Sequence, residues 1–198
     1  LTGGNKHTSI QEAIRSVRES MNFMLKGSKD RCRTVQFFSM SPSSGKTFVC
    51  INVAFSLAFS GKKVILLDLD LRKGSLSSRL NLKDRLLGIS NYLVDEEVEL
   101  GNIIQHVQAP TCTFDAIAAG TVPPNPTEIL RDKRLDDMLS ILKMMYDYII
   151  IDNPPYDMVV DALVCSRFCD LSVYIIRADK FDKRLLPDVQ NLLDSQKL

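Results

Sequence analysis

A glycine, a lysine and a threonine stand together at residues 45–47, at the end of a polar segment with the spacing of a phosphate-binding loop. The segment S-P-S-S-G-K-T follows the pattern G-x-x-x-x-G-K-[ST], except that the first glycine of the pattern is missing. In such loops the backbone N–H groups surround a β-phosphate, the lysine neutralises β- and γ-oxygens, and the hydroxyl binds Mg²⁺. We therefore expect ATP or ADP with Mg²⁺ to bind here, through Ser41, Ser43, Ser44, Gly45, Lys46, Thr47 and Phe48.

The segments on either side of the loop have the patterns that such a loop requires. An apolar run at residues 34–38 predicts a buried strand, and the run from residue 48 to about residue 59 is long enough for a helix. A helix that begins directly after the loop adds the partial positive charge of its N-terminus where the phosphate binds. A chance Gly-Lys-Thr in a surface loop is the alternative explanation.

Three aspartates follow two other apolar runs and could organise the metal ion. Asp152 ends the run at residues 148–151, and Asp68 and Asp70 follow the run at residues 64–67. Acids at the carboxyl ends of parallel strands can reach the Mg²⁺ of a bound nucleotide. Asp68 and Asp70 share one side if the chain stays extended, which is unfavourable unless a cation or a proton separates their charges. The spacing therefore indicates either Mg²⁺ ligands or a proton acceptor.

Each acid also has an ordinary explanation. Asp152 could simply end a strand and cap a turn. The segment around Asp68 could be a solvated turn in which Asp70 pairs with Arg72 or Lys73. The phosphate loop in the same chain favours the metal-binding interpretation.

Strand and helix patterns alternate along the chain, which predicts an α/β fold with a mostly parallel central sheet and helices on both faces. We expect residues 9–198 to form one such domain and residues 1–8 to be a flexible N-terminal segment. The predicted strands are residues 34–39, 64–68, 114–118, 148–152 and 171–176. The predicted helices are residues 10–25, begun by a capping box at Ser9–Glu12, and residues 48–59, 127–145, 158–169 and 182–195, with short helical turns between 76 and 107.

Composition and charge narrow the class of protein. The 198 residues carry 25 Lys and Arg against 24 Asp and Glu, which gives no reason to expect nucleic acid as a partner. The five cysteines form no C-x-x-C pair and only two histidines are present, so we expect reduced cysteines in a cytosolic setting and no zinc site. No apolar run is long enough to span a membrane. Because the chain begins with Leu1, we expect a fragment of a longer membrane protein that is soluble by itself.

Five segments together resemble the motifs of the bacterial tyrosine kinases, in the same order along the chain. Residues 12–18 (E-A-I-R-S-V-R) fit the E-x-x-R-x-x-R motif, and residues 41–47 resemble the Walker A motif. Residues 66–74 (L-L-D-L-D-L-R-K-G) resemble the distinctive Walker A′ motif of the family. Residues 120–130 (G-T-V-P-P-N-P-T-E-I-L) are similar to the segment after the third strand, and residues 150–155 (I-I-D-N-P-P) resemble Walker B.

The resemblance covers about residues 9–180 and implies a P-loop NTPase fold with ATP-dependent protein-tyrosine kinase activity, including autophosphorylation in trans. It implies that Lys46 holds the β- and γ-phosphates and that Asp68 accepts the proton of the tyrosine hydroxyl. The implied catalytic residues are Lys46, Asp68, Asp70 and Asp152. The implied metal site consists of Thr47, Asp68, Asp70 and Asp152, acting directly or through water.

The resemblance also implies partners and a location. Members of the family form rings through the E-x-x-R-x-x-R helix, here Glu12, Arg15 and Arg18, and phosphorylate the tyrosine-rich tail of a neighbouring subunit. They act at the cytoplasmic face of the bacterial inner membrane, fused to transmembrane segments or bound to a membrane activator, and regulate capsule or exopolysaccharide synthesis and export. Internal Glu–Arg pairing on a solvated helix is the alternative explanation of the motif. Because charge-rich contacts weaken with salt, the isolated domain could be monomeric.

Two family features are missing, and two other functions stay open. The chain ends at Leu198 without a tyrosine cluster, and most of its five tyrosines lie on apolar patterns expected in the core. The last strand of the family, with its asparagine near the adenine, is also missing, so the residues that bind the base are not assigned. A partitioning or division-site ATPase is one alternative, although that class carries a lysine directly after the first residue of the loop and this chain has Met40 there. A non-catalytic module that senses ATP while regulating polysaccharide length is the other.

Overall fold

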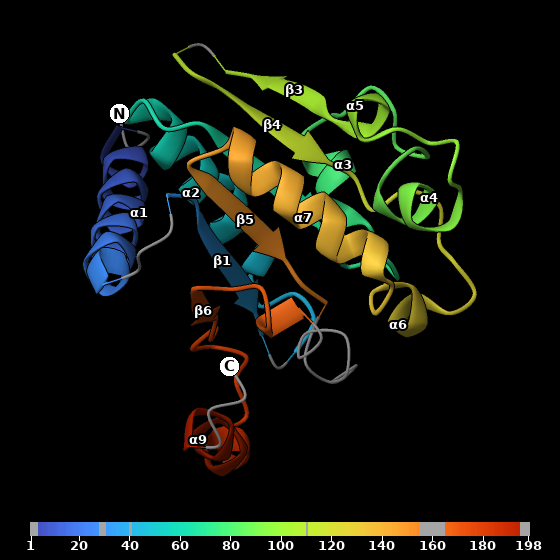
Figure 1. The fold of residues 1–198 in the computed structure, drawn as a ribbon. Helices are drawn as coiled ribbons and strands as arrows, with labels where there is room; N and C mark the ends of the chain where they lie inside the picture. Colours follow the sequence, from blue (N-terminus) through green and yellow to red (C-terminus); the bar gives the residue numbers. More distant parts are fainter. Residues whose placement is uncertain (1–3, 28–30, 40, 110, 155–164, 195–198) are drawn as a thin grey trace.

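The protein is described by a computed structural model that places residues 4–27, 31–39, 41–109, 111–154 and 165–194. Within these residues six strands form one sheet in the order β3-β4-β2-β5-β1-β6 (Figure 1). Among the described strand pairs, β3 with β4 is antiparallel and the others are parallel. The strands are β1 (Arg33–Phe38), β2 (Val64–Asp68), β3 (Gln105–Gln108), β4 (Thr113–Ile117), β5 (Tyr148–Asp152) and β6 (Leu171–Tyr174). The predicted α/β fold with a mostly parallel sheet is confirmed.

Helices cover both faces of the sheet (Figure 1). One face packs against α2, with α1 outside it, and the other against α7, α4 and α5. The central strands β2 and β5 are buried along their whole length, as their continuous apolar runs predict for strands covered on both faces. The helices are α1 (Gly4–Met24), α2 (Lys46–Phe59), α3 (Ser75–Arg79), α4 (Ile89–Val94), α5 (Leu100–Ile103), α6 (Pro126–Ile129), α7 (Lys133–Met145) and α9 (Leu186–Asp194), with 3₁₀ turns η1 (Leu25–Gly27) and η3 (Lys183–Leu185).

A line of polar side chains crosses three neighbouring strands inside this apolar sheet. The side chain of Asn153, just after β5, donates to Gln36 of β1 at 2.8 Å, and Gln36 donates to the hydroxyl of Ser172 of β6 at 2.7 Å. Gln36 and Ser172 are direct register partners. Because a buried amide without partners is costly, these hydrogen bonds fix how β6 lies against β1.

Several predicted boundaries were wrong. The first helix begins at Gly4 rather than residue 10, so Ser9 lies inside the helix and the predicted capping box does not start it. The polar residues before position 10 gave no apolar periodicity from which the earlier start could be read. The final helix of residues 182–195 is a 3₁₀ turn followed by α9. The predicted helix over residues 158–169 falls mostly outside the described residues.

Two further differences concern the segments around β4. The predicted helix over 127–145 is two helices, because Asp132 adopts an extended conformation and its carboxylate caps α7 by accepting the N–H of Arg134 at 2.8 Å. The antiparallel strand β3 was missed among the expected helical turns. Its four residues are mostly polar, and only Val107 is buried, so the strand lacks an apolar signal.

Gly61, two residues after the end of α2, has a left-handed conformation with φ of 83°, and its N–H donates to Ala58 O at 2.9 Å. The expectation that most of the tyrosines lie in the core is confirmed for three of them. The side chains of Tyr92, Tyr146 and Tyr148 are buried in the core. Throughout the described residues, none of the helices combines the length and apolar character needed to cross a membrane.

Candidate active site

Residues 41–45 of the phosphate loop lie between β1 and the N-terminus of α2, in the predicted order of strand, loop and helix. Gly45 directly precedes the helix with φ of 95°, a left-handed conformation that side chains resist. Ser43 is also left-handed, with φ of 61°, at a cost of about 1–2 kcal/mol for a residue other than glycine. The hydroxyl of Ser44 donates to Ser41 O at 2.6 Å and holds the curve of the loop.

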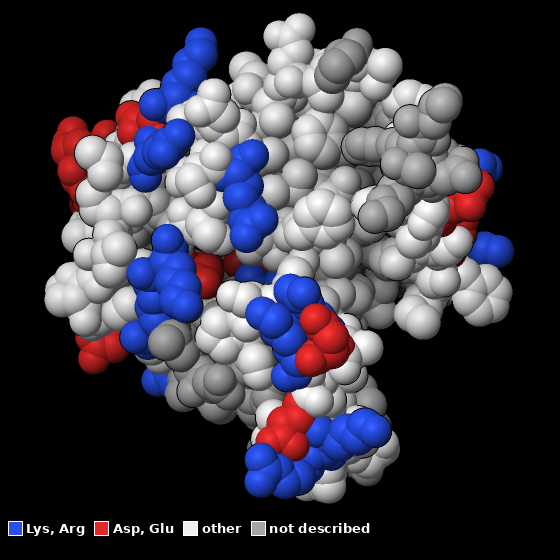
Figure 2. Space-filling view, turned by 180° about the vertical axis from the view of Figure 1, so that it is seen from behind, with Lys and Arg blue, Asp and Glu red and all other residues white. Residues whose placement is uncertain are grey.

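All seven residues predicted to bind the nucleotide line one pocket of about 800 Å³. The loop and the start of α2 form one wall. A second wall contains Asp70 and the start and end of α3, and a third follows β6 at residues 175–178. Figure 2 shows this side of the molecule, where Lys and Arg side chains stand around a hollow with acidic side chains inside it. The predicted lining residues brought together here are Ser41, Ser43, Ser44, Gly45, Lys46, Thr47 and Phe48.

Lys46 and Asp152 form a buried ion pair at the base of this pocket. The exposed fraction is 7% for Lys46 and zero for Asp152. Burial of the Lys46 ammonium lowers its pKa, but the negative charge of Asp152 and their hydrogen bond more than offset this, so the pKa is raised and the lysine stays charged. The thiol of Cys50 also points at Asp152 Oδ1, at 3.6 Å. The other oxygen, Oδ2, has no hydrogen-bond partner among the described residues.

Asp68 lies beside Asp152, because these two residues are register partners at the ends of β2 and β5. Both oxygens of the Asp68 carboxylate accept backbone N–H groups, from Asp70 at 3.2 Å and from Leu76 at 3.0 Å. Complete burial raises the pKa of Asp68 well above its usual value, and the charge of Asp152 raises it further. Two adjacent buried carboxylates are unfavourable without a cation, which is the environment expected of a metal site before the ion binds.

Asp70 is the acid that lines the pocket. Its carboxylate accepts the N–H of Lys73 at 3.2 Å. Burial raises the pKa of Asp70, while the positive charge of Lys46 acts in the opposite direction. Asp68 and Asp152 lie beneath the pocket, fully buried, so the predicted acids are close together but at two depths.

These residues fit a magnesium ion that also binds phosphate. No three His, Cys, Asp or Glu side chains of the described residues converge into a metal centre. Mg²⁺ in nucleotide sites is held by one or two carboxylates, waters and the phosphates, and therefore needs no such protein cage. The partnerless oxygen of Asp152 and the hydroxyl of Thr47, 3.4 Å from that of Ser75, are the oxygen donors that such an ion prefers.

Sequence reasoning missed most of the second and third walls. Ser75 and Arg79 were not predicted, although their spacing of four residues places them on one face of a short helix. Cys50 was expected only as one of five reduced cysteines, and the structure places its thiol against Asp152. The residues after β6 could not be predicted as pocket lining because no motif marks them.

The stability of the ligand-free protein is expected to fall as pH rises, relative to an Asp68→Asn variant. A folded-state pKa above the unfolded value means that the native state binds the proton more tightly, so the stabilisation is present at low pH and is lost as pH rises through the folded pKa. Melting temperatures measured in EDTA from pH 8 to pH 5 should therefore increasingly favour the wild type as the pH is lowered. A pH-independent difference between the two proteins would contradict the assignment.

Comparison with known proteins finds relatives that are named tyrosine-protein kinases. Residues 33–168 match the model of a family described as AAA domain. The tyrosine-protein kinase CpsD of Streptococcus pneumoniae is 30% identical over 164 residues, which are 82% of this chain and 70% of CpsD. The tyrosine-protein kinase etk of Escherichia coli is 36% identical over 177 residues, which are 89% of this chain. The chain spans only 24% of the length of that relative.

Solved structures agree with the sequence relatives. The kinase domain of the Escherichia coli tyrosine kinase ETK superposes with a TM-score of 0.84 and 33% identity, covering 94% of this chain and 71% of that one. The septum site-determining protein MinD of Pyrococcus horikoshii, solved with Mg-ADP, gives a TM-score of 0.65 at 22% identity, covering 84% of this chain and 67% of that one. At that identity the second likeness shows a shared P-loop NTPase fold.

Proposed function

The chain belongs to the bacterial tyrosine-kinase family, and from this premise we propose that it transfers the γ-phosphate of Mg·ATP to tyrosine side chains. The observation that carries the proposal is one pocket lined by Lys46, Thr47 and Asp70, with Asp68 and Asp152 buried beneath it, in a chain with relatives named tyrosine-protein kinase. Phosphoryl transfer needs positioning and charge neutralisation more than covalent help from the protein, and this pocket offers both.

The residues of the phosphate loop bind and orient the triphosphate. The N–H groups at the start of α2 and the ammonium of Lys46 hold the β- and γ-phosphates. Thr47, Asp68, Asp70 and Asp152 would hold Mg²⁺, directly or through water, and the ion would supply charge neutralisation of the phosphate oxygens. The ion pair with Asp152 keeps the Lys46 ammonium fixed in the pocket before the nucleotide arrives, so little reorganisation is needed at the moment of transfer.

A carboxylate of the Walker A′ segment receives the proton of the tyrosine hydroxyl. We propose Asp68 for this role. Its two amide hydrogen bonds leave acceptor sites unused, since a carboxylate can accept about four. Asp70 lines the pocket and is the alternative acceptor. Both acids also help to organise the metal, so Asp68→Asn and Asp70→Asn should be compared by their pH–rate profiles, in which only the acceptor contributes the acidic limb.

Substrate, partners and location of the whole protein follow from the family as proposals. The acceptor is a tyrosine-rich tail of a neighbouring copy, since Tyr92, Tyr146 and Tyr148 of this chain are buried in the core. The relatives named for the capsule support a role in capsule or exopolysaccharide synthesis and export. We propose action at the cytoplasmic face of the bacterial membrane, together with fused transmembrane segments or a membrane activator.

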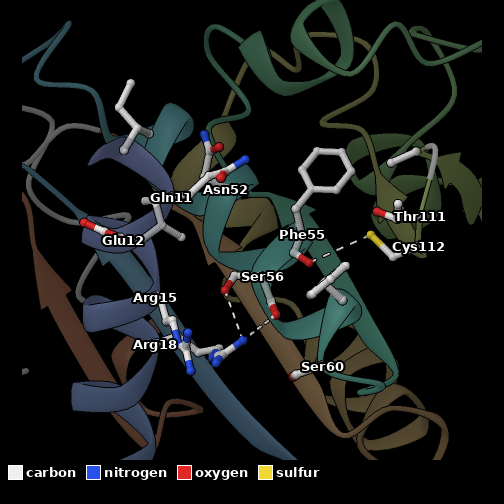
Figure 3. A pocket seen from close by; sticks show the side chains of 14 residues that line it. Gln11, Glu12, Arg15, Arg18, Asn52, Phe55, Ser56, Ser60, Thr111 and Cys112 are labelled. Atoms are coloured by element: carbon white, nitrogen blue, oxygen red, sulfur yellow. Dashed lines mark hydrogen bonds between the residues drawn. The ribbon is translucent and has the colours of Figure 1, made fainter. Parts of the chain in front are cut away.

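The arginines proposed to form a ring occupy different environments at a groove of about 740 Å³ between α1 and α2 (Figure 3). Arg18 is turned inward and donates to Ser56 O at 2.9 Å and to its hydroxyl at 3.3 Å. Arg15 and Glu12 are exposed along the groove. We therefore propose that Arg15 and Glu12 face the neighbouring copy, while Arg18 fixes α1 to α2.

Substituting the two arginines should separate assembly from stability. Arg15→Ala is expected to weaken the oligomer without changing the melting temperature, because the side chain is exposed. Arg18→Ala is expected to cost about 1–3 kcal/mol of stability, because it removes a charged donor from a partly buried carbonyl. Sedimentation velocity at low and high salt and thermal melting measure the two effects. If Arg15→Ala leaves the assembly intact, this assignment of the interface is wrong.

A phosphotyrosine assay decides among the three candidate functions. The chain is incubated with Mg·ATP and a tyrosine-containing acceptor polypeptide, beside a Lys46→Met control. Phosphotyrosine in the wild type alone supports the kinase. ADP release without phosphotyrosine supports an ATPase switch of the division-site type, and nucleotide binding without either product supports a sensor. Either of the last two results would overturn the proposal.

A further inference from the structure

The order of the strands determines which end of the pocket holds the terminal phosphate. The phosphate loop follows β1, and β5 and then β2 lie on one side of β1 while β6 lies on the other. Asp152 and Asp68 end β5 and β2, so the metal-binding acids lie on that side of the loop. A magnesium ion held by these acids would neutralise the terminal phosphate oxygens, so we expect the γ-phosphate to lie toward β2 and toward α3, which follows it.

Helix α3 is attached to the metal site by its first turn. The hydroxyl of Ser75 lies 3.4 Å from that of Thr47, and the N–H of Leu76 donates to Asp68 at 3.0 Å. The Leu76 side chain is fully buried, which anchors the helix from below. Arg79 lies four residues after Ser75 and therefore on the same face of the helix, and its side chain lines the pocket.

Four cationic side chains line the pocket, and three of them already interact with acids. Lys46 pairs with Asp152, and Arg177 pairs with Asp179 at 2.8 Å. The charge of Lys73 acts on Asp70 and lowers its pKa. Arg79, the fourth, makes no hydrogen bond or ion pair with any residue that the structure describes.

The charges at the γ-phosphate end require a further cation. Asp68, Asp70 and Asp152 lie there against the ammonium groups of Lys46 and Lys73. Even with a divalent ion bound, a triphosphate would meet little net positive charge at the atom where transfer occurs. A guanidinium suits this task because its planar array of five N–H donors can contact two phosphoryl oxygens at once.

We propose that Arg79 is a catalytic residue that binds the γ-phosphoryl oxygens from the wall that contains α3 during transfer; the inference rests on the proposed kinase function. The tyrosine oxygen forms a bond to the γ-phosphorus while the bond from that phosphorus to the β–γ bridging oxygen breaks. ADP keeps the electron pair of the broken bond, and the phenolic proton passes to the Walker A′ carboxylate. The guanidinium of Arg79 neutralises the charge spread over the equatorial oxygens.

Three variants of the chain test the proposal by turnover. Arg79→Ala is expected to lower kcat for phosphotyrosine formation by about 10³-fold, the lower end of the range for an arginine supplied to a phosphoryl group. Guanidine hydrochloride added at millimolar concentration should restore part of the activity of Arg79→Ala and none of that of Lys46→Met. Arg85→Ala, an exposed arginine that does not line the pocket, should behave as wild type. A wild-type kcat in Arg79→Ala, or a rise in the acceptor KM alone, would overturn the proposal, since the latter places Arg79 on the acceptor polypeptide.

A binding measurement separates failure of this inference from failure of the proposed function. A fluorescent ADP analogue with Mg²⁺ is titrated into each protein with and without aluminium fluoride, which occupies the place of the transferred phosphoryl group. Fluoride should tighten binding in wild type and Arg85→Ala but not in Arg79→Ala, with the affinity for the ADP analogue alone unchanged. If the wild type makes no phosphotyrosine but shows this pattern, the kinase proposal fails and the assignment of Arg79 stands. Equal tightening in all three proteins would refute the role of Arg79.

Discussion

Replacing Lys46 with methionine is expected to lower phosphotyrosine formation by about 10³-fold or more, and to destabilise the protein as well. The loss of activity follows because the ammonium that neutralises the β- and γ-oxygens is removed from the pocket. The loss of stability follows because Asp152, fully buried, is left with an uncompensated charge. Removing one partner of a buried pair costs about 3–5 kcal/mol.

Two measurements distinguish the chemical effect from the folding effect. Thermal melting of Lys46→Met should show a fall of roughly 10 °C, given about 2–4 °C per kcal/mol for a domain of this size. The double variant Lys46→Met/Asp152→Asn should regain much of the lost melting temperature, because the unpaired buried carboxylate is removed. It should stay inactive. Circular dichroism at the assay temperature checks that each protein is folded. If Lys46→Met melted like wild type, the buried pair would not contribute to stability as described.

Replacing Gly88 with alanine is expected to destabilise the protein by about 3 kcal/mol or more. The chain before α4 runs against the end of β4, where Ile89 and Ser90 donate backbone hydrogen bonds to Ala118 O and Ala119 O, each at 2.9 Å. A Cβ at position 88 would lie 2.6 Å from the nitrogen of Gly120 and still closer to the carbonyl oxygen of Ala118. These are backbone atoms, so the two segments must separate and the hydrogen bonds between them must weaken.

A second glycine supplies the matched control. A Cβ at Gly101, in α5, would meet no atom within 4 Å. Alanine there should therefore stabilise the protein by about 0.5–1 kcal/mol, since it restricts the unfolded chain and favours the helix. Urea unfolding of both variants measures the two effects. Equal stabilities for Gly88→Ala and Gly101→Ala would mean that the close approach of the two segments is not needed for folding.

The parts of the fold that sequence predicted well are those with strong apolar signals. The runs ending at Asp68 and Asp152 are continuous and bounded by turns, and both strands are where they were expected. The break at Asp132 was missed because apolar spacing continues across it, and only the capping geometry reveals it. Strand β3 was missed because a short, polar edge strand is stabilised by pairing with β4 rather than by its own composition.

The same reasoning applies to the site. The loop residues and the acids were predictable because a nucleotide and Mg²⁺ demand particular chemical types at particular spacings. The depths of the acids were not predictable. Asp70 lines the pocket and Asp68 lies beneath it, and this difference depends on how α3 packs over the end of β2. Arg79 was missed because one exposed arginine carries no signal until the strand order places it beside the loop.

The polar line from Asn153 through Gln36 to Ser172 has a consequence for how faithfully the sheet assembles. Parallel strands with apolar faces can slip along one another with little loss of burial, and β6 is short, with every residue only half-buried. If β6 shifted by one residue along β1, an aliphatic side chain would lie opposite Gln36. The buried Gln36 amide would then lose its hydrogen bond to Ser172. A shifted pairing of β6 with β1 is therefore less stable than the native one. Because the third wall of the pocket directly follows β6, the native pairing is a condition for a complete nucleotide site.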